Sequence, residues 1–180
     1  MLGPLCGTIH SNKHVLSNGT HQDAVIKFTN RHNKILDLLA AWFTFKLDSK
    51  STLFVDLPGS RYKQVTDIFS SVRPDLVIVN EKSVLIVELT ICHETNLRSS
   101  KMYKEQKYKD RKDFKSSLIK DHDLVLTTCE LSVLGFLQFD NSAYQKFAIP
   151  PFDENIINNI AKTVIQSSFD IYIQRDIENA

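Results

Sequence analysis

Short apolar runs and helical spacings alternate along this chain, and together they predict a mixture of strands and helices. Residues 76–79 and 84–89 are apolar, rich in β-branched side chains and separated by the polar turn Asn80-Glu81-Lys82. Such runs are typical of strands buried on both faces, and the short turn predicts that they pair as a hairpin. Further extended segments are predicted over residues 53–57, 123–130 and 131–139.

Three other segments predict helices. Apolar residues between positions 22 and 47 approximate helical spacing with an interruption near Thr29-Asn30, so we expect one long helix or a short helix followed by a longer one. Residues 99–113 are polar and helix-forming. After the break at Pro150-Pro151, Asp153 can cap a helix over residues 154–173. This order of elements predicts an α/β fold with a mixed central sheet flanked by helices.

Length and composition fit one globular domain. The chain has 180 residues, 42% of them apolar and 24% charged, so it can bury a core and is not of the disordered class. A net charge of only +1 argues against a protein that coats nucleic acid nonspecifically. Basic residues are nevertheless concentrated in one segment, at Lys101, Lys104, Lys107, Lys109, Arg111, Lys112 and Lys115.

The spacing of the cysteines and the hydropathy of the chain indicate the cellular compartment of the protein. Cys6, Cys92 and Cys129 lack the spacing of a disulfide framework and fit reduced thiols. No run reaches the length of a membrane span, and the N-terminus lacks the charged start and apolar middle of a signal peptide. We therefore expect a nuclear or cytoplasmic protein that is not secreted and does not enter a membrane.

Residues 1–22 are polar, and we predict a poorly structured segment ahead of a domain over residues 23–180. The segment contains Cys6, His10 and His14, a mixture that raises the question of zinc. A closed zinc site needs four ligands at regular spacing. Gly3 and Gly19 stand where further ligands of a zinc knuckle would be expected, so zinc is not expected here.

Two acids are associated with the predicted hairpin. Asp75 begins its first strand, and Glu88 lies inside the apolar run of its second strand. A carboxylate in a buried strand is costly unless something binds it. Oxygen ligands from one or two carboxylates suit Mg²⁺ or Mn²⁺. Asp75 can equally be a turn residue after a proline, and Asp56 is either a third acid of the site or the polar end of a strand.

Basic residues on the following segment complete the candidate site. Lys104, Lys107, Tyr108 and Arg111 fall at i, i+3, i+4 and i+7, so they share one face of a helix. Such a face is either solvated or directed at phosphates. Arg31 is placed near the start of a predicted helix, where a positive charge opposes the helix dipole. It too is either a solvated side chain or one that reaches a phosphate.

Five motifs in series carry a resemblance to a known family: Arg31-His32-Asn33-Lys34-Ile35-Leu36, Asp56-Leu57-Pro58-Gly59, Pro74-Asp75, Glu88-Leu89-Thr90 with Glu94, and the KxxKY motif at 104–108. Over roughly residues 10 to 130 the chain resembles the PD-(D/E)XK nuclease superfamily. It is most similar to the restriction-like endonuclease domain of site-specific non-LTR retrotransposons. The resemblance implies a restriction-endonuclease-like fold.

The resemblance also implies an activity, the nicking of double-stranded DNA with Mg²⁺ or Mn²⁺ so that the freed 3′ hydroxyl primes reverse transcription. Asp75 and Glu88 would hold the metal, and Lys104 would orient the attacking water or stabilise the phosphate. Lys107 and Tyr108 would contact the phosphate or position Lys104. The residues expected to contact DNA are Arg31, Arg73, Lys101 and Arg111.

The family's partners would be DNA and a reverse transcriptase region of the same polyprotein, and a homodimer is one arrangement that the resemblance allows. Thr90 departs from the superfamily, because it replaces the lysine of the E-x-K motif and cannot carry charge. Two alternatives stay open. One is a catalytically silent nuclease-fold module that binds nucleic acid or a protein, and the other is structure-selective cleavage of branched DNA by the same residues.

Overall fold

The computed structural model describes residues 22–70, 72–108, 121–140 and 142–177. Their strands form one five-stranded sheet in the order β1-β2-β3-β4-β5. Strands β1 (Thr52–Val55), β2 (Leu76–Val79) and β3 (Ser83–Cys92) pair antiparallel in succession. Strand β4 (Asp123–Ser132) is parallel to β3, and β5 (Leu137–Phe139) is antiparallel to β4. The mixed sheet and the predicted hairpin are therefore confirmed.

Local hydrogen bonds explain the turn between β2 and β3. The side-chain oxygen of Asn80 accepts hydrogen bonds from the backbone N–H groups of Lys82 at 3.0 Å and Ser83 at 2.8 Å. Asparagine often stabilises a tight turn in this way. The turn fixes the register of the hairpin, in which Leu76 pairs with Val87 and Val79 pairs with Val84.

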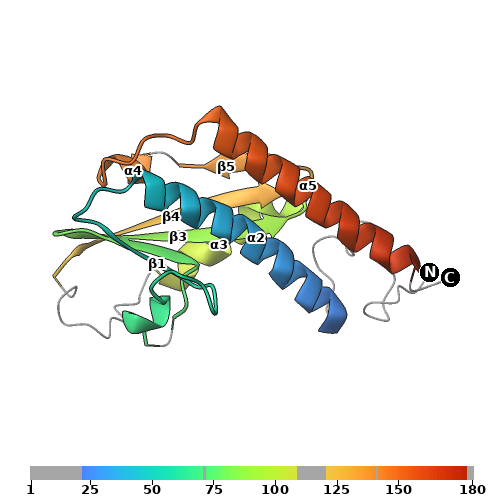
Figure 1. Ribbon diagram of the computed structural model, residues 1–180, viewed down its shortest axis with the longest axis horizontal. Coiled ribbons are helices and arrows are strands. Elements are labelled where there is room, and N and C mark those ends of the chain that lie inside the picture. The colour runs from blue at the N-terminus through green and yellow to red at the C-terminus, as the bar shows by residue number, and fades with distance from the viewer. Residues whose placement is uncertain (1–21, 71, 109–120, 141, 178–180) are drawn as a thin grey trace.

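Helices cover both faces of the sheet, so the architecture is α/β. Helices α2 (Gln22–Lys46) and α5 (Glu154–Ile177) run side by side across one face, and α3 (Leu97–Tyr108) lies on the opposite face (Figure 1). Helix α3 connects the parallel strands β3 and β4. Within the described parts of the connections lie three shorter helices: η1 (Val65–Asp67), η2 (Glu94–Asn96) and α4 (Ser142–Gln145).

Helix α2 is continuous, so the expectation of one long helix is confirmed, and the interrupted apolar spacing near Thr29-Asn30 does not divide it. The Thr29 hydroxyl donates a hydrogen bond of 2.8 Å to the carbonyl of Val25, which keeps this polar side chain satisfied within the helix. As a consequence Arg31 and His32 lie in the middle of α2 and not near its start.

Side chains of β3 alternate between two hydrophobic clusters. Leu85, Val87 and Leu89 belong to the cluster that includes residues of α2 and α5. Val84 and Ile86 belong to the cluster that includes the last residue of α3. Because side chains of a strand alternate with a period of two, Glu88 faces the α3 side of the sheet.

The capping role expected for Asp153 is confirmed at the start of α5. Its Oδ1 accepts a hydrogen bond of 3.1 Å from the backbone N–H of Ile156. The preceding Phe152 packs against Trp42 of α2, with ring centroids 4.6 Å apart. Phe152 also contacts Tyr144 of α4. The three rings therefore pack α2, α4 and the start of α5 against one another.

Some expectations fall on residues outside the described ranges. These are the N-terminal segment with Cys6, His10 and His14, residues 109–113 of the predicted basic helix, and Arg111. Among the helices that the structure does describe, none is both long enough and apolar enough to cross a bilayer.

Candidate active site

The predicted acid pair forms at one end of the β2–β3 hairpin. Asp75 directly precedes β2, and Glu88 lies within β3. Because Leu76 pairs with Val87 in the antiparallel register, the residues just outside this pair, Asp75 and Glu88, are brought next to each other. Glu88 is 0% exposed, and a carboxylate at such a position needs strong partners.

Helix α3 supplies those partners. The Lys104 ammonium lies 3.4 Å from Asp75 Oδ2 and also contacts Glu88 Oε2. The Lys107 ammonium lies 3.2 Å from Glu88 Oε1, and the Tyr108 hydroxyl donates to the same oxygen. The three described members of the predicted stripe on α3 therefore converge on the acid pair.

His32 is a site residue whose role the sequence did not reveal. Its Nε2 lies 3.4 Å from Asp75 Oδ1. On the other oxygen, Asp75 Oδ2 accepts a hydrogen bond of 2.7 Å from the backbone N–H of Leu89. His32 and Asp75 are 43 positions apart, and only the packing of α2 on the sheet brings them together.

Asp75, His32 and Lys104 each favour the charged form of a neighbour in the site. Burial by itself raises the pKa of Asp75, but the hydrogen bond and charge of His32, the charge of Lys104 and the Leu89 N–H lower that pKa to about 2. Burial lowers the pKa of His32, yet Asp75 outweighs burial and raises it above its ordinary value. Burial likewise lowers the pKa of Lys104, and the charges of Asp75 and Glu88 raise it by more.

The residues expected to contact DNA are not all near the acid pair. Arg31 is only 3% exposed, and its guanidinium donates a hydrogen bond of 2.9 Å to the Ser168 hydroxyl between α2 and α5. This is a correction, because a guanidinium buried between two helices offers little surface to a phosphate. Lys101 lies one turn before Lys104 and is paired with Glu105 at 4.0 Å.

Arg73 lies at the rim of the site. Its side chain is 60% exposed and pairs with Asp56, while its carbonyl accepts a hydrogen bond of 3.4 Å from Lys107. The side chain of Asp56 is therefore paired with Arg73 and not with a residue of the acid pair.

The donor set suits a hard divalent cation. Within the described ranges no group of three or more His, Cys, Asp or Glu side chains is arranged to hold a metal. Mg²⁺ does not require one, because it commonly takes one or two carboxylates and completes its shell with water and substrate phosphates. The Lys104 ammonium contacts both carboxylates, so the site already attracts a cation.

A further buried acid lies on the neighbouring strand. Glu130 of β4 is 1% exposed and pairs in register with Thr90. In the described part of the chain, neither Glu130 carboxylate oxygen nor the Thr90 hydroxyl has a hydrogen-bond partner. Burial raises the pKa of Glu130, although the charge of Lys101 reduces this effect.

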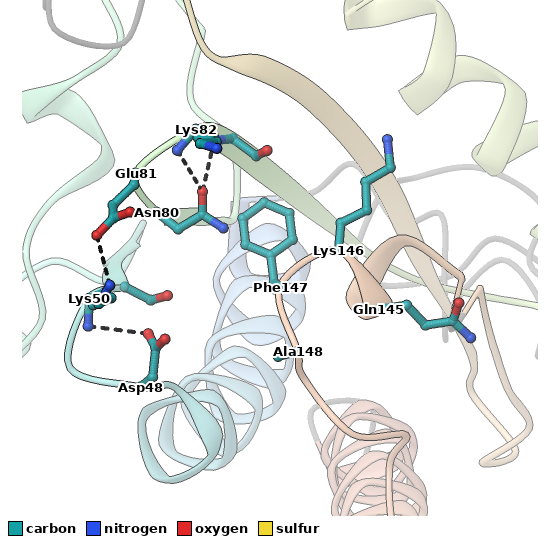
Figure 2. Close-up of a pocket in the computed structure, with 11 residues that line it drawn as sticks. Asp48, Lys50, Asn80, Glu81, Lys82, Gln145, Lys146, Phe147 and Ala148 are labelled. Atoms are coloured by element: carbon teal, nitrogen blue, oxygen red, sulfur yellow. Dashed lines mark hydrogen bonds and ion pairs between the residues drawn. The ribbon is translucent and has the colours of Figure 1, made fainter.

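A separate hollow of about 440 Å³ lies at the opposite end of the hairpin, around Asn80 and Lys82 (Figure 2). Its ion pair joins Lys50 and Glu81 at 3.1 Å, and Asp48 accepts a hydrogen bond from the Lys50 backbone. Four residues of β2 separate Asn80 from Asp75, which corresponds to about 16 Å along an extended strand. The side chains of Lys50 and Glu81 are largely exposed, as is typical of an ion pair on a solvated surface.

Neither a protein-family model nor a curated protein matches this chain. The features of the chain that bear on its function are the acid pair, the basic helix and the α/β fold that brings them together.

Proposed function

We propose that this protein is a metal-dependent endonuclease that nicks double-stranded DNA by phosphodiester hydrolysis. The observation that carries the proposal is that one ammonium, that of Lys104, contacts both carboxylates of the acid pair. Two carboxylates and a lysine at one position are the components that phosphodiester cleavage needs. The proposal includes the restriction-endonuclease-like form of the fold and a relationship to the retrotransposon domains that the sequence resembles.

Asp75 and Glu88 would hold the Mg²⁺ or Mn²⁺. When bound, the metal would supply a water of lowered pKa and would neutralise charge on the phosphate oxygens. Lys104 would donate to the phosphate as negative charge develops there. His32 would keep Asp75 ionised and oriented, because it lies on the Asp75 oxygen that Lys104 does not contact.

Lys107 and Tyr108 would orient Glu88, because both contact its Oε1. Arg73 is exposed at the rim and would bind a neighbouring phosphate of the DNA backbone. A reverse transcriptase region of the same polyprotein and a second copy of the chain remain proposed partners beside DNA.

A second candidate function is a catalytically silent module that binds nucleic acid or a protein. It is favoured by one observation, since every carboxylate oxygen of the acid pair already has a partner within the protein. In that case the cluster would be a structural network that joins α2, α3 and the hairpin.

The two candidates are separated by nicking of supercoiled plasmid with Mg²⁺ and with Mn²⁺. We expect metal-dependent nicking by the wild type, none by Asp75→Ala, and a rate about 10²–10³-fold lower in Lys104→Ala, the loss typical of removing one electrostatic donor. The matched control is Lys82→Ala, an exposed lysine at the opposite end of the hairpin, which should nick like the wild type. A folded wild type that binds DNA without nicking it would favour the silent module.

A further inference from the structure

A second hollow, of about 310 Å³, lies directly beside the acid pair. Its lining residues are Thr90, Ser99, Ser100, Tyr103 and Lys104. Four of these come from α3 and form two i, i+4 pairs, Ser99 with Tyr103 and Ser100 with Lys104, so they occupy adjacent stripes of the helix. Because Lys104 also contacts both carboxylates, any ligand of this hollow would lie next to a phosphate held at the acid pair.

Among the residues that line the hollow, Tyr103 is the one whose side chain has no structural role in the described part of the chain. It is 72% exposed, and within the described ranges its side chain makes no hydrogen bond and no ring contact. An exposed aromatic ring contributes little to a core. Its flat face is the kind of surface on which nucleobases stack, since every base has a π-face.

Hydroxyl groups on the other sides of the hollow can pair with polar edges. The Thr90 hydroxyl is buried and lacks a hydrogen-bond partner in the described part of the chain, a situation that costs stability unless a ligand or solvent satisfies it. The Ser99 hydroxyl donates a hydrogen bond of 3.0 Å to the Asn96 carbonyl and can still accept another hydrogen bond. The volume lies at the lower end of the ~300–1,000 Å³ typical of small-ligand pockets.

We propose that this hollow binds one nucleobase that has left the base stack, with its ring against Tyr103 and its polar edge toward the Thr90 hydroxyl. The inference rests on the proposed function, because Lys104 belongs both to this hollow and to the phosphate position. Within the proposed double-stranded substrates, it makes duplex DNA that carries an unpaired nucleotide beside the phosphate to be cleaved the preferred one. An unpaired base costs less to unstack than a paired one, so such DNA should be bound preferentially.

The test is DNA binding in metal-free buffer with EDTA, where no cleavage can occur, at one fixed salt concentration. Fluorescence anisotropy compares a fully paired duplex with the same duplex carrying one extra unpaired adenine. We expect the wild type to bind the second duplex about tenfold more tightly, the range of one base–aromatic stack. Tyr103→Phe should keep this preference, and Tyr103→Leu should lose it without weaker binding of the paired duplex.

Two further variants sharpen the result. Thr90→Val removes the hydroxyl at nearly constant shape and should reduce the preference, while Met102→Leu, an exposed neighbour outside the hollow, should leave it unchanged. Equal binding of both duplexes by the wild type, or a preference that survives Tyr103→Leu, would overturn the inference.

Failure of the inference and failure of the proposed function give different results. Plasmid nicking without a preference for the unpaired adenine would leave the nuclease standing and remove the nucleobase site. A preference without nicking would keep the nucleobase site on a binding module. Absence of any DNA binding would overturn both.

Discussion

Asp75 stays ionised because its partners outweigh its burial. His32, Lys104 and the Leu89 N–H together bring its pKa to about 2, well below the ordinary aspartate value near 3.9. A carboxylate whose pKa is lowered in the folded state stabilises that state above the unfolded pKa, and the stabilisation is lost as the pH falls through the folded pKa. Asp75 should therefore contribute to stability at neutral pH and lose its contribution in acid.

Urea unfolding at about pH 5 and about pH 2 measures this contribution. In the wild type the free energy of unfolding should fall over this range by about 2 kcal/mol more than in Asp75→Asn, which has no carboxyl group to protonate at this position. An equal fall in both proteins would mean that the partners of Asp75 do not lower its pKa. Circular dichroism of both proteins at about pH 5 provides the control for a common fold.

The sequence identified several site residues, and it missed others for physical reasons. Glu88 was recognisable because an acid inside an apolar run must have a partner. His32 was not, because its partner is 43 positions away and only the packing of α2 reveals it. Neighbouring residues on a helix point about 100° apart, so Arg31 faces α5 while His32 reaches Asp75.

At the scale of elements, the apolar runs of the sequence predicted the positions of the strands better than the pairing between them. Strand β2 matches the predicted residues, whereas β3 extends past residue 89 to Cys92. The extra residues pair with the end of β4, where Cys92 lies opposite Ser132. Parallel pairing joins segments that are far apart in sequence, so neither this extension nor the order of the strands could be predicted from local pattern.

The β4–β5 turn gives a stability prediction for an element contact. Gly135 has a φ of +91°, and a Cβ there would lie 2.9 Å from Ile165 Cδ1 of α5 and 3.3 Å from Ala161 Cβ. We expect Gly135→Ala to lower the free energy of unfolding by about 2 kcal/mol, from backbone strain together with crowding against α5. Thermal and urea unfolding measure the loss.

Gly59 provides the matched control for this change. It also has a positive φ, +69°, but a Cβ there would meet no atom within 4 Å. Gly59→Ala should therefore cost only the backbone strain, about 1 kcal/mol. A loss at Gly59 as large as that at Gly135 would show that the contact with α5 adds nothing.

At the scale of the whole molecule, a net charge of +1 leaves no general attraction to DNA. Binding must depend on where the charges lie. Arg73 projects from the rim of the acid pair, whereas Lys82 lies at the far end of the hairpin. The mixed sheet itself was predictable from the order of the elements, but this distribution of charge was visible only after the strands were paired.

The salt dependence of DNA affinity tests this distribution. Each phosphate contact contributes about 0.9 to the slope of log K against log salt for duplex DNA. Arg73→Gln should reduce that slope by about 1 and weaken binding of different sequences equally. The matched change Lys82→Gln should leave the slope as it is. An equal effect of both changes would argue against a DNA path across the acid-pair end of the sheet.

Binding of Mn²⁺, followed by the paramagnetic resonance signal of the free ion, tests most directly whether the acid pair is a site for a divalent cation. We predict binding by the wild type, at least about tenfold weaker binding by Asp75→Asn, and tighter binding by Lys104→Met, because the ammonium that contacts both carboxylates no longer competes. A wild type that leaves Mn²⁺ free with and without duplex DNA, or an Asp75→Asn protein that binds it equally well, would contradict the account.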